Sequence, residues 1–108
     1  MEFIKAIDGQ YKYQLSLEIM REGETYIVYS HSLDLSAYGN TEAEATKNFH
    51  SSLKLFLRET SIKGTLDQVL SELGWSKTES IRRQDQPEWN SRLMFSSRKT
   101  DSGLVLAS

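Results

Sequence analysis

The sequence predicts an α+β fold: a three-stranded antiparallel sheet covered by one long helix, then a short second helix and an irregular C-terminal segment. Three observations support this fold. Apolar and polar residues alternate over residues 11–19, which is the period of a strand with one covered face. Apolar residues recur every three to four positions over residues 45–57, which is typical of a helix packed on one side. A glycine turn and a helix-capping pattern separate the two regions at residues 39–44.

The composition is that of one globular domain. The chain has 108 residues, of which 38% are hydrophobic and 26% charged, as in a soluble protein with a modest core. No apolar run approaches the roughly 18 residues of a membrane span, and residues 1–5 lack the features of a signal peptide. The absence of cysteine excludes disulfides, thiolate metal sites and a cysteine nucleophile. We therefore expect a cytoplasmic protein.

The charge is distributed unevenly along the chain. The net charge is −2, but residues 1–75 carry −4 and residues 76–108 carry +2. An acidic body suits a basic protein partner better than nucleic acid, which attracts basic surfaces. The alternative is that so small an imbalance has no functional meaning.

Three strands are expected before the long helix. Residues 11–19 form the first, and Gly23 supplies the hairpin loop that leads to a second strand at residues 25–29. Residues 33–38 form a third strand in an antiparallel meander, and residues 1–10 are a lead-in. The polar face of the third strand carries Asp34, Ser36 and Tyr38. The first strand has a free edge in this arrangement, so we expect a homodimer or higher homo-oligomer.

The long helix begins after Thr41. Thr41 and Glu44 form a capping box, and the positive end of the helix dipole favours Glu42 and Glu44 in the first turn. The residues that face the sheet are Ala45, Phe49, Leu53, Phe56 and Leu57. The helix runs to about Ser61 and is stopped by Gly64. At about 30 Å it matches a strand of about 33 Å, so it can lie along the whole sheet.

A shorter helix follows, with a second capping-box pattern at residues 65–68. Its apolar face consists of Leu66, Val69, Leu70 and Leu73. Gly74 suits the left-handed position after a helix, and Trp75 can then fold back on Leu70.

Residues 76–108 are expected to form a C-terminal extension to a domain at residues 1–75. Two apolar runs, at residues 92–96 and 104–106, flank a turn at residues 100–103. The extension is therefore interpreted as a weak hairpin or a partly disordered segment.

The strand order, followed by Gly-x-Thr-x-x-Glu-Ala at the start of a helix, resembles the HicB-like antitoxin family over residues 11–75. The matching residues are Tyr26, Tyr29, Leu33-Asp34-Leu35, Gly39, Thr41, Glu44-Ala45, Asn48-Phe49, Leu53, Leu57 and Leu73-Gly74-Trp75. The resemblance implies a partial ribonuclease-H-like ββ(β)α fold and assembly into dimers or tetramers. It also implies neutralisation of a small basic toxin of the HicA type, which cleaves messenger RNA.

The sequence departs from the family pattern at three places. Ser30-His31 stands where the family often has Cys-Pro, and Asn40 replaces the usual acidic residue. Residues 76–108 contain no recognisable helix-turn-helix or ribbon-helix-helix segment. This argues against DNA binding and favours a stand-alone member of the family.

Four residues are predicted to contact a partner: His31, Asp34, Tyr38 and Glu42. The first three are polar residues of the family-like region to which the pattern gives no structural task, and Glu42 belongs to the acidic helix start. We expect a non-enzymatic antitoxin-like protein with no catalytic residues, no metal and no cofactor.

Other functions are compatible with the same residues. A stand-alone oligomeric scaffold without a toxin is the main alternative. A degenerate metal-dependent nuclease would use Asp34, Glu42 and Glu44, because such chemistry needs converging carboxylates. Tyrosines on the first two strands could stack single-stranded nucleic acid, although packing against the helix is the favoured interpretation.

Overall fold

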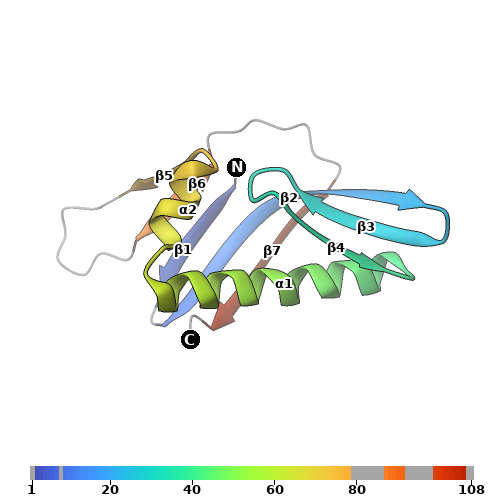
Figure 1. Ribbon diagram of the computed structural model, residues 1–108, viewed down its shortest axis with the longest axis horizontal. Helices are drawn as coiled ribbons and strands as arrows, with labels where there is room; N and C mark the ends of the chain where they lie inside the picture. Colours follow the sequence, from blue (N-terminus) through green and yellow to red (C-terminus); the bar gives the residue numbers. More distant parts are fainter. Residues whose placement is uncertain (1, 8, 79–86, 92–98, 107–108) are drawn as a thin grey trace.

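The computed structural model describes residues 2–7, 9–78, 87–91 and 99–106 of the chain. They form an α+β domain of one antiparallel sheet and two helices (Figure 1). The strands are β1 (Phe3–Ile7), β2 (Gln10–Glu22), β3 (Thr25–Ser30), β4 (Leu35–Gly39), β5 (Trp75–Thr78), β6 (Glu88–Ser91) and β7 (Lys99–Leu106). The helices are α1 (Glu42–Lys63) and α2 (Leu66–Glu72). The predicted α+β class is confirmed, but the prediction of three strands is wrong.

β2 is the strand around which the sheet is built. Residues 10–14 pair with β1 on one edge, and residues 10–17 pair with β7 on the other. Residues 18–22 pair with β3 instead. The order along the sheet is β4-β3-β2-β1-β6-β5, and β7 is a seventh strand on β2. The free edge predicted for this strand is therefore paired over part of its length by β1 of the same chain.

Both the lead-in and the C-terminal extension contain strands that the sequence analysis did not predict. Residues 3–7, which the sequence analysis assigned to a lead-in before the first strand, form β1, and its Ile4 is fully buried. The turn predicted at residues 100–103 is wrong, because these residues lie inside β7. Gly103 lies opposite Tyr13, and a Cβ there would come within 2.6 Å of the tyrosine hydroxyl oxygen. The apolar run at residues 92–96 lies outside the described residues.

α1 has the start and end that the sequence predicts. The backbone N–H of Glu44 donates to Thr41 Oγ1 (3.0 Å), and Glu44 Oε1 accepts from the backbone N–H of Asn40 (3.2 Å). Gly64 closes the helix with a left-handed φ of 69°. The fully buried residues of α1 are Ala45, Phe49, Leu53 and Leu57. They share one core with Val28 of β3 and Leu15 of β2.

Tyrosines of β2 fasten the sheet to α1. Tyr11 is 7% exposed and its hydroxyl lies 2.5 Å from Ser61 Oγ. Tyr13 is 2% exposed and hydrogen-bonds Nδ1 of His50. These contacts support the packing role for the two tyrosines rather than a stacking platform for nucleic acid.

The second helix differs from prediction at its start. Thr65 makes no side-chain capping bond, because its backbone is not extended and its N–H donates to Thr60 O. The predicted second capping box is therefore wrong. Gly74 has the predicted left-handed conformation, with a φ of 94°. Trp75 then begins β5, and its indole N–H donates to the backbone oxygen of Ser32 (2.8 Å).

At Gly39 the backbone of β4 lies close to the first turn of α1. A Cβ on Gly39 would lie 2.4 Å from the backbone nitrogen of Ala45 and 2.9 Å from its Cα. Because both atoms are backbone, no side-chain rotation could relieve the overlap. Glycine at this position allows β4 to pass directly into the first turn of α1.

Neither of the helices in the described part of the chain is long and apolar enough to cross a membrane.

Candidate functional site

Residues 18–22 of β2 form one end of the sheet with β3 and β4, and one face of this end packs on α1. The candidate site lies on the opposite face. The register places Met20 opposite Ile27 and Ile27 opposite Tyr38, so these side chains form one row across three strands. The neighbouring row, which faces the core, consists of Ile19, Val28 and Ala37. Met20 is 40% exposed and Tyr38 58% exposed. We define the open face as this apolar row together with Glu18, Glu22 and Asp34 beside it.

The open face belongs to the most acidic part of the chain. Residues 18–44, called the acidic end below, carry six carboxylates and one basic side chain, a net charge of −5. The rest of the chain carries +3. The single basic residue, Arg21, is directed to its own hairpin: its Nε donates to Gly23 O (2.9 Å) and its guanidinium lies 5.6 Å from the Tyr26 ring. The acidic end therefore presents a field that attracts cationic partners.

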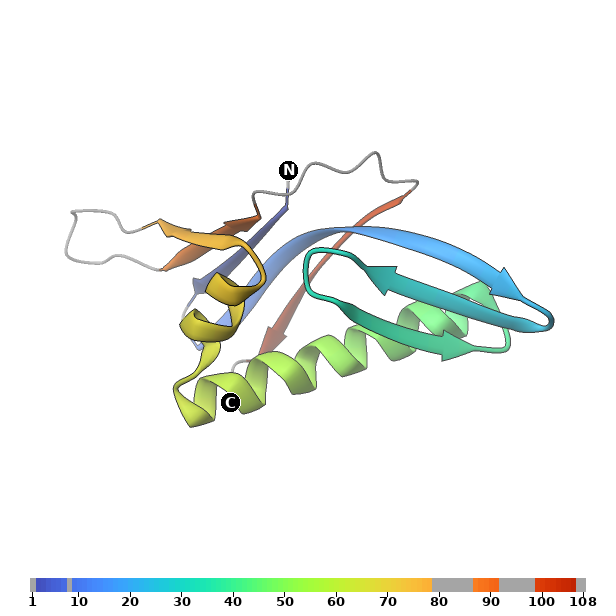
Figure 2. The same cartoon turned by 45° about the horizontal axis from the view of Figure 1, so that its top comes forward.

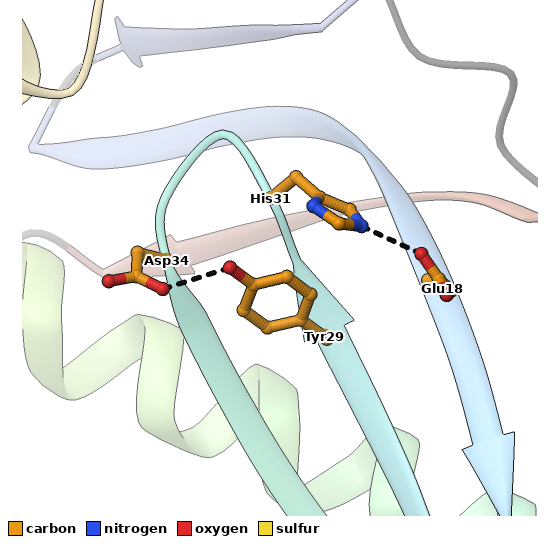
Figure 3. Close-up of polar contacts among 4 residues, drawn as sticks. All are labelled: Glu18, Tyr29, His31 and Asp34. Atoms are coloured by element: carbon orange, nitrogen blue, oxygen red, sulfur yellow. Dashed lines mark hydrogen bonds and ion pairs between the residues drawn. The ribbon is translucent and has the colours of Figure 1, made fainter.

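Four polar residues form a cluster at one border of the open face (Figure 3). His31 Nε2 lies 2.7 Å from Glu18 Oε2, and the Tyr29 hydroxyl donates to Asp34 Oδ1 (2.9 Å). The rings of Tyr29 and His31 meet edge to face, with centroids 4.5 Å apart. Glu18 and His31 each keep about two-fifths of the side chain exposed. The carboxylates are thus held in place while remaining accessible.

The backbone of the turn between β3 and β4 explains the position of Asp34. Asp34 has a φ of 51°, a left-handed conformation that aspartate tolerates better than most residues. It lies in the turn and not in a strand, so the prediction of a strand from residue 33 is wrong; β4 begins at Leu35. The left-handed turn brings the Asp34 carboxylate back toward Tyr29.

The same turn is held from inside by buried polar groups. Ser32 is fully buried, and its hydroxyl donates to Glu2 Oε2 (2.9 Å), which also accepts the backbone N–H of Ser16 (2.9 Å). The indole of Trp75 binds the Ser32 carbonyl. Glu2 is 5% exposed, and its Oε1 has no hydrogen-bond partner among the residues that the structure describes. The turn is therefore fixed on its inner side by groups from β2, β5 and the N-terminus.

The contact with Asp34 changes the acidity of Tyr29. The hydrogen bond to Asp34 raises the pKa of Tyr29 above its ordinary value of 10.0, because the bond exists only while the hydroxyl is protonated. Partial burial and the negative charges of Asp34 and Glu18 raise the pKa further. The hydroxyl of Tyr29 is accordingly held neutral as a donor.

The structure brings together some of the predicted partner-binding residues. His31 and Asp34 belong to the cluster around Tyr29, and Tyr38 lies in the apolar row of the same face. Glu42 lies in the first turn of α1, outside the cluster. Glu42 lines a shallow hollow along α1 together with Ala43, Thr46, Lys47 and His50.

Sequence reasoning assigned no role in binding a protein partner to four residues of the site: Glu18, Met20, Ile27 and Tyr29. The alternation along β2 places Glu18 and Met20 on its polar face, but only the register shows that Met20, Ile27 and Tyr38 adjoin. Ile27 and Tyr29 lie in a run of β-branched and aromatic residues, in which no polar alternation marks the exposed face.

A second hollow lies at the opposite end of the molecule. It is open, has a volume of about 270 Å³, and is lined among others by Tyr11, Asp67, Lys77 and Trp89. Asp67 already accepts from Trp89 Nε1 (2.8 Å) and Lys77 Nζ (3.0 Å). The side chains of Asp67, Lys77 and Trp89 in this hollow therefore bind one another.

Within the described residues, no group of three or more histidine, aspartate or glutamate side chains could hold a metal ion. Asp34 and Glu44, two of the carboxylates considered for a nuclease, are engaged by Tyr29 and by the helix cap. Comparison with family models, curated proteins and solved structures finds no match to this chain. The resemblance to HicB-like antitoxins therefore stays a prediction.

Proposed function

We propose that this protein is a non-enzymatic binding protein of the HicB-like antitoxin type, which binds and neutralises a small basic protein such as a HicA-type messenger-RNA-cleaving toxin. The open face is the proposed docking surface. The observation that carries the proposal is the apolar row of Met20, Ile27 and Tyr38, whose two end members are exposed, within an end of the chain that has a net charge of −5.

The two parts of this surface have different tasks. An apolar row with aromatic and methionine side chains suits the buried centre of an interface, since such residues are enriched there. The carboxylates at its border attract a cationic partner and fix its orientation, which affects association rate and specificity more than raw affinity. His31 and Tyr29 hold Glu18 and Asp34 in defined positions, so these carboxylates lose little side-chain freedom on binding.

The experiment is co-purification with the product of the adjacent gene, where that product is a small basic protein. Glu22→Lys should weaken the complex and the relief of toxicity, because this carboxylate is exposed on the open face. Glu72→Lys is the matched control, because the exposed Glu72 lies on α2. Absence of binding, or equal losses at both places, would contradict the proposal.

A further inference from the structure

The outward side of α1 carries two exposed aliphatic side chains. Leu55 is 56% exposed and Ile62 is 69% exposed, although both lie in the helix that supplies the core. They are seven residues apart and therefore point in nearly the same direction, about 10.5 Å from one another along the axis. The buried side chains of Leu53 and Leu57 point to the other side of the helix. We call Lys54, Leu55, Arg58 and Ile62 the outer stripe.

The outer stripe is basic where the open face is acidic. Lys54 and Arg58 are exposed, and no described carboxylate lies within salt-bridge distance of either side chain. The neighbouring Glu59 is paired with Lys63 at 4.0 Å, so its charge is offset on the helix itself. The stripe therefore combines two aliphatic groups with two cations.

We propose that a second copy of this chain docks its outer stripe on the open face. The apolar row of Met20, Ile27 and Tyr38 crosses three strands and is about 9.6 Å long, which matches the separation of about 10.5 Å between Leu55 and Ile62. A helix lying along this row places Lys54 and Arg58 beside the carboxylates of the open face. In this arrangement apolar groups contact apolar groups, and charges of opposite sign lie next to each other.

The two surfaces lie on opposite sides of the molecule, which determines the form of the assembly. α1 lies along one face of β3 and β4 (Figure 2), and the open face is the other side of those strands. The exposure of Leu55 and Ile62, on the side of α1 opposite the buried Leu53 and Leu57, places the outer stripe away from the sheet. A contact between two different surfaces is heterologous, so it leaves one unused surface at each end of a dimer. Self-association accordingly proceeds head to tail and is not a closed pair of identical patches.

The contact uses the open face but needs no other protein, so it stands or falls separately from the proposed antitoxin function. A helix on three strands buries less than the roughly 1,200 Å² of stable interfaces, so the association is transient. Charge pairing at its border also makes it sensitive to salt. A cationic partner bound to the open face would displace the second copy.

The test is sedimentation velocity on the full chain from about 10 μM to about 1 mM, at low and at high salt. The wild type should gain mass with concentration and lose it in high salt. Tyr38→Glu removes the docking face and Leu55→Glu removes the docking helix, and each variant alone should remain monomeric. Both positions are exposed, so circular dichroism should show an unchanged fold.

The decisive sample is the equal mixture of the two variants. The intact helix of Tyr38→Glu can dock on the intact face of Leu55→Glu, so the mixture should regain mass and stop at a dimer. Met20→Glu and Ile62→Glu form a second pair with the same expected behaviour. A wild type that stays monomeric, a mixture that does not associate, or either single variant that still associates would overturn the proposal.

Discussion

The two halves of β2 lie in different surroundings, although one alternating pattern runs through both. In the first half, paired on both edges by β1 and β7, the inward side chains from Tyr11 to Leu17 are at most 7% exposed. In the second half, the described partner is β3 alone, the inward Ile19 is only partly buried, and the outward Met20 is 40% exposed. The first half is therefore built for stability, and the second leaves an apolar row available for binding.

The difference arises from segments far away in the sequence. β1 and β7, which enclose the first half, come from the two ends of the chain. The second half is followed directly by its own hairpin partners, β3 and β4, so it forms a local unit of acidic composition. Long-range pairing makes one end compact, and local pairing leaves one face of the other end open.

Sequence reasoning worked where structure is local. Thr41, Glu44 and Gly64 act within one or two turns of α1, and the pattern identified all three correctly. It failed for residues 100–103, because pairing of β7 with β2 involves residues about 90 positions apart and outweighs the turn tendency of Ser102 and Gly103. The candidate site was half visible: His31, Asp34 and Tyr38 were predicted, but their neighbours required the strand register.

The largest expected effect is at Gly39, where β4 leads into α1. Gly39→Ala places a methyl group against the backbone of Ala45 and should lower the free energy of unfolding by about 3 kcal/mol. Gly23→Ala is the control, because it has open space but a left-handed φ of 62°, and should cost about 1 kcal/mol. Urea denaturation measures both; equal losses would show that the close approach is not rigid.

The next effect concerns Trp75, whose indole joins the start of β5 to the turn between β3 and β4. Trp75→Phe removes the donor to the buried Ser32 carbonyl and should cost about 2 kcal/mol. Trp89→Phe should cost less, because the freed Asp67 oxygen belongs to a side chain that is 58% exposed and also binds Lys77. A larger loss for Trp89→Phe in the same denaturation measurement would contradict the greater contribution expected from the buried Trp75 hydrogen bond.

A smaller effect separates the two predicted helix caps. Thr41→Ala should destabilise the protein by about 1 kcal/mol, because the threonine accepts a hydrogen bond from the backbone of Glu44. Thr65→Ala should change stability by less than about 0.5 kcal/mol, because Thr65 makes no capping bond. Thermal unfolding of both variants provides the check, and a similar cost at the two positions would refute the difference.

The contact between Tyr29 and Asp34 should be detectable in the titration of Tyr29. The pKa of Tyr29 should lie above 10.0, and Asp34→Asn should lower it, since the amide carries no charge. Because the raised pKa favours the neutral hydroxyl in the folded state, the associated stability is present below about pH 10 and is lost as pH rises through the folded pKa. Tyrosine ring NMR shifts report this titration; an unchanged value in Asp34→Asn would exclude the contact in solution.

The most direct test of the open face is calorimetry with a small basic protein of the kind proposed above as the partner. Tyr38→Ser should weaken binding at least about tenfold without loss of stability, because Tyr38 is 58% exposed and lies in the apolar row. Ile62→Ser, a change at a position that is 69% exposed on the opposite side of the molecule, should leave this affinity unchanged. Tight binding by Tyr38→Ser, or a loss confined to Ile62→Ser, would contradict the assignment of the open face as the docking surface.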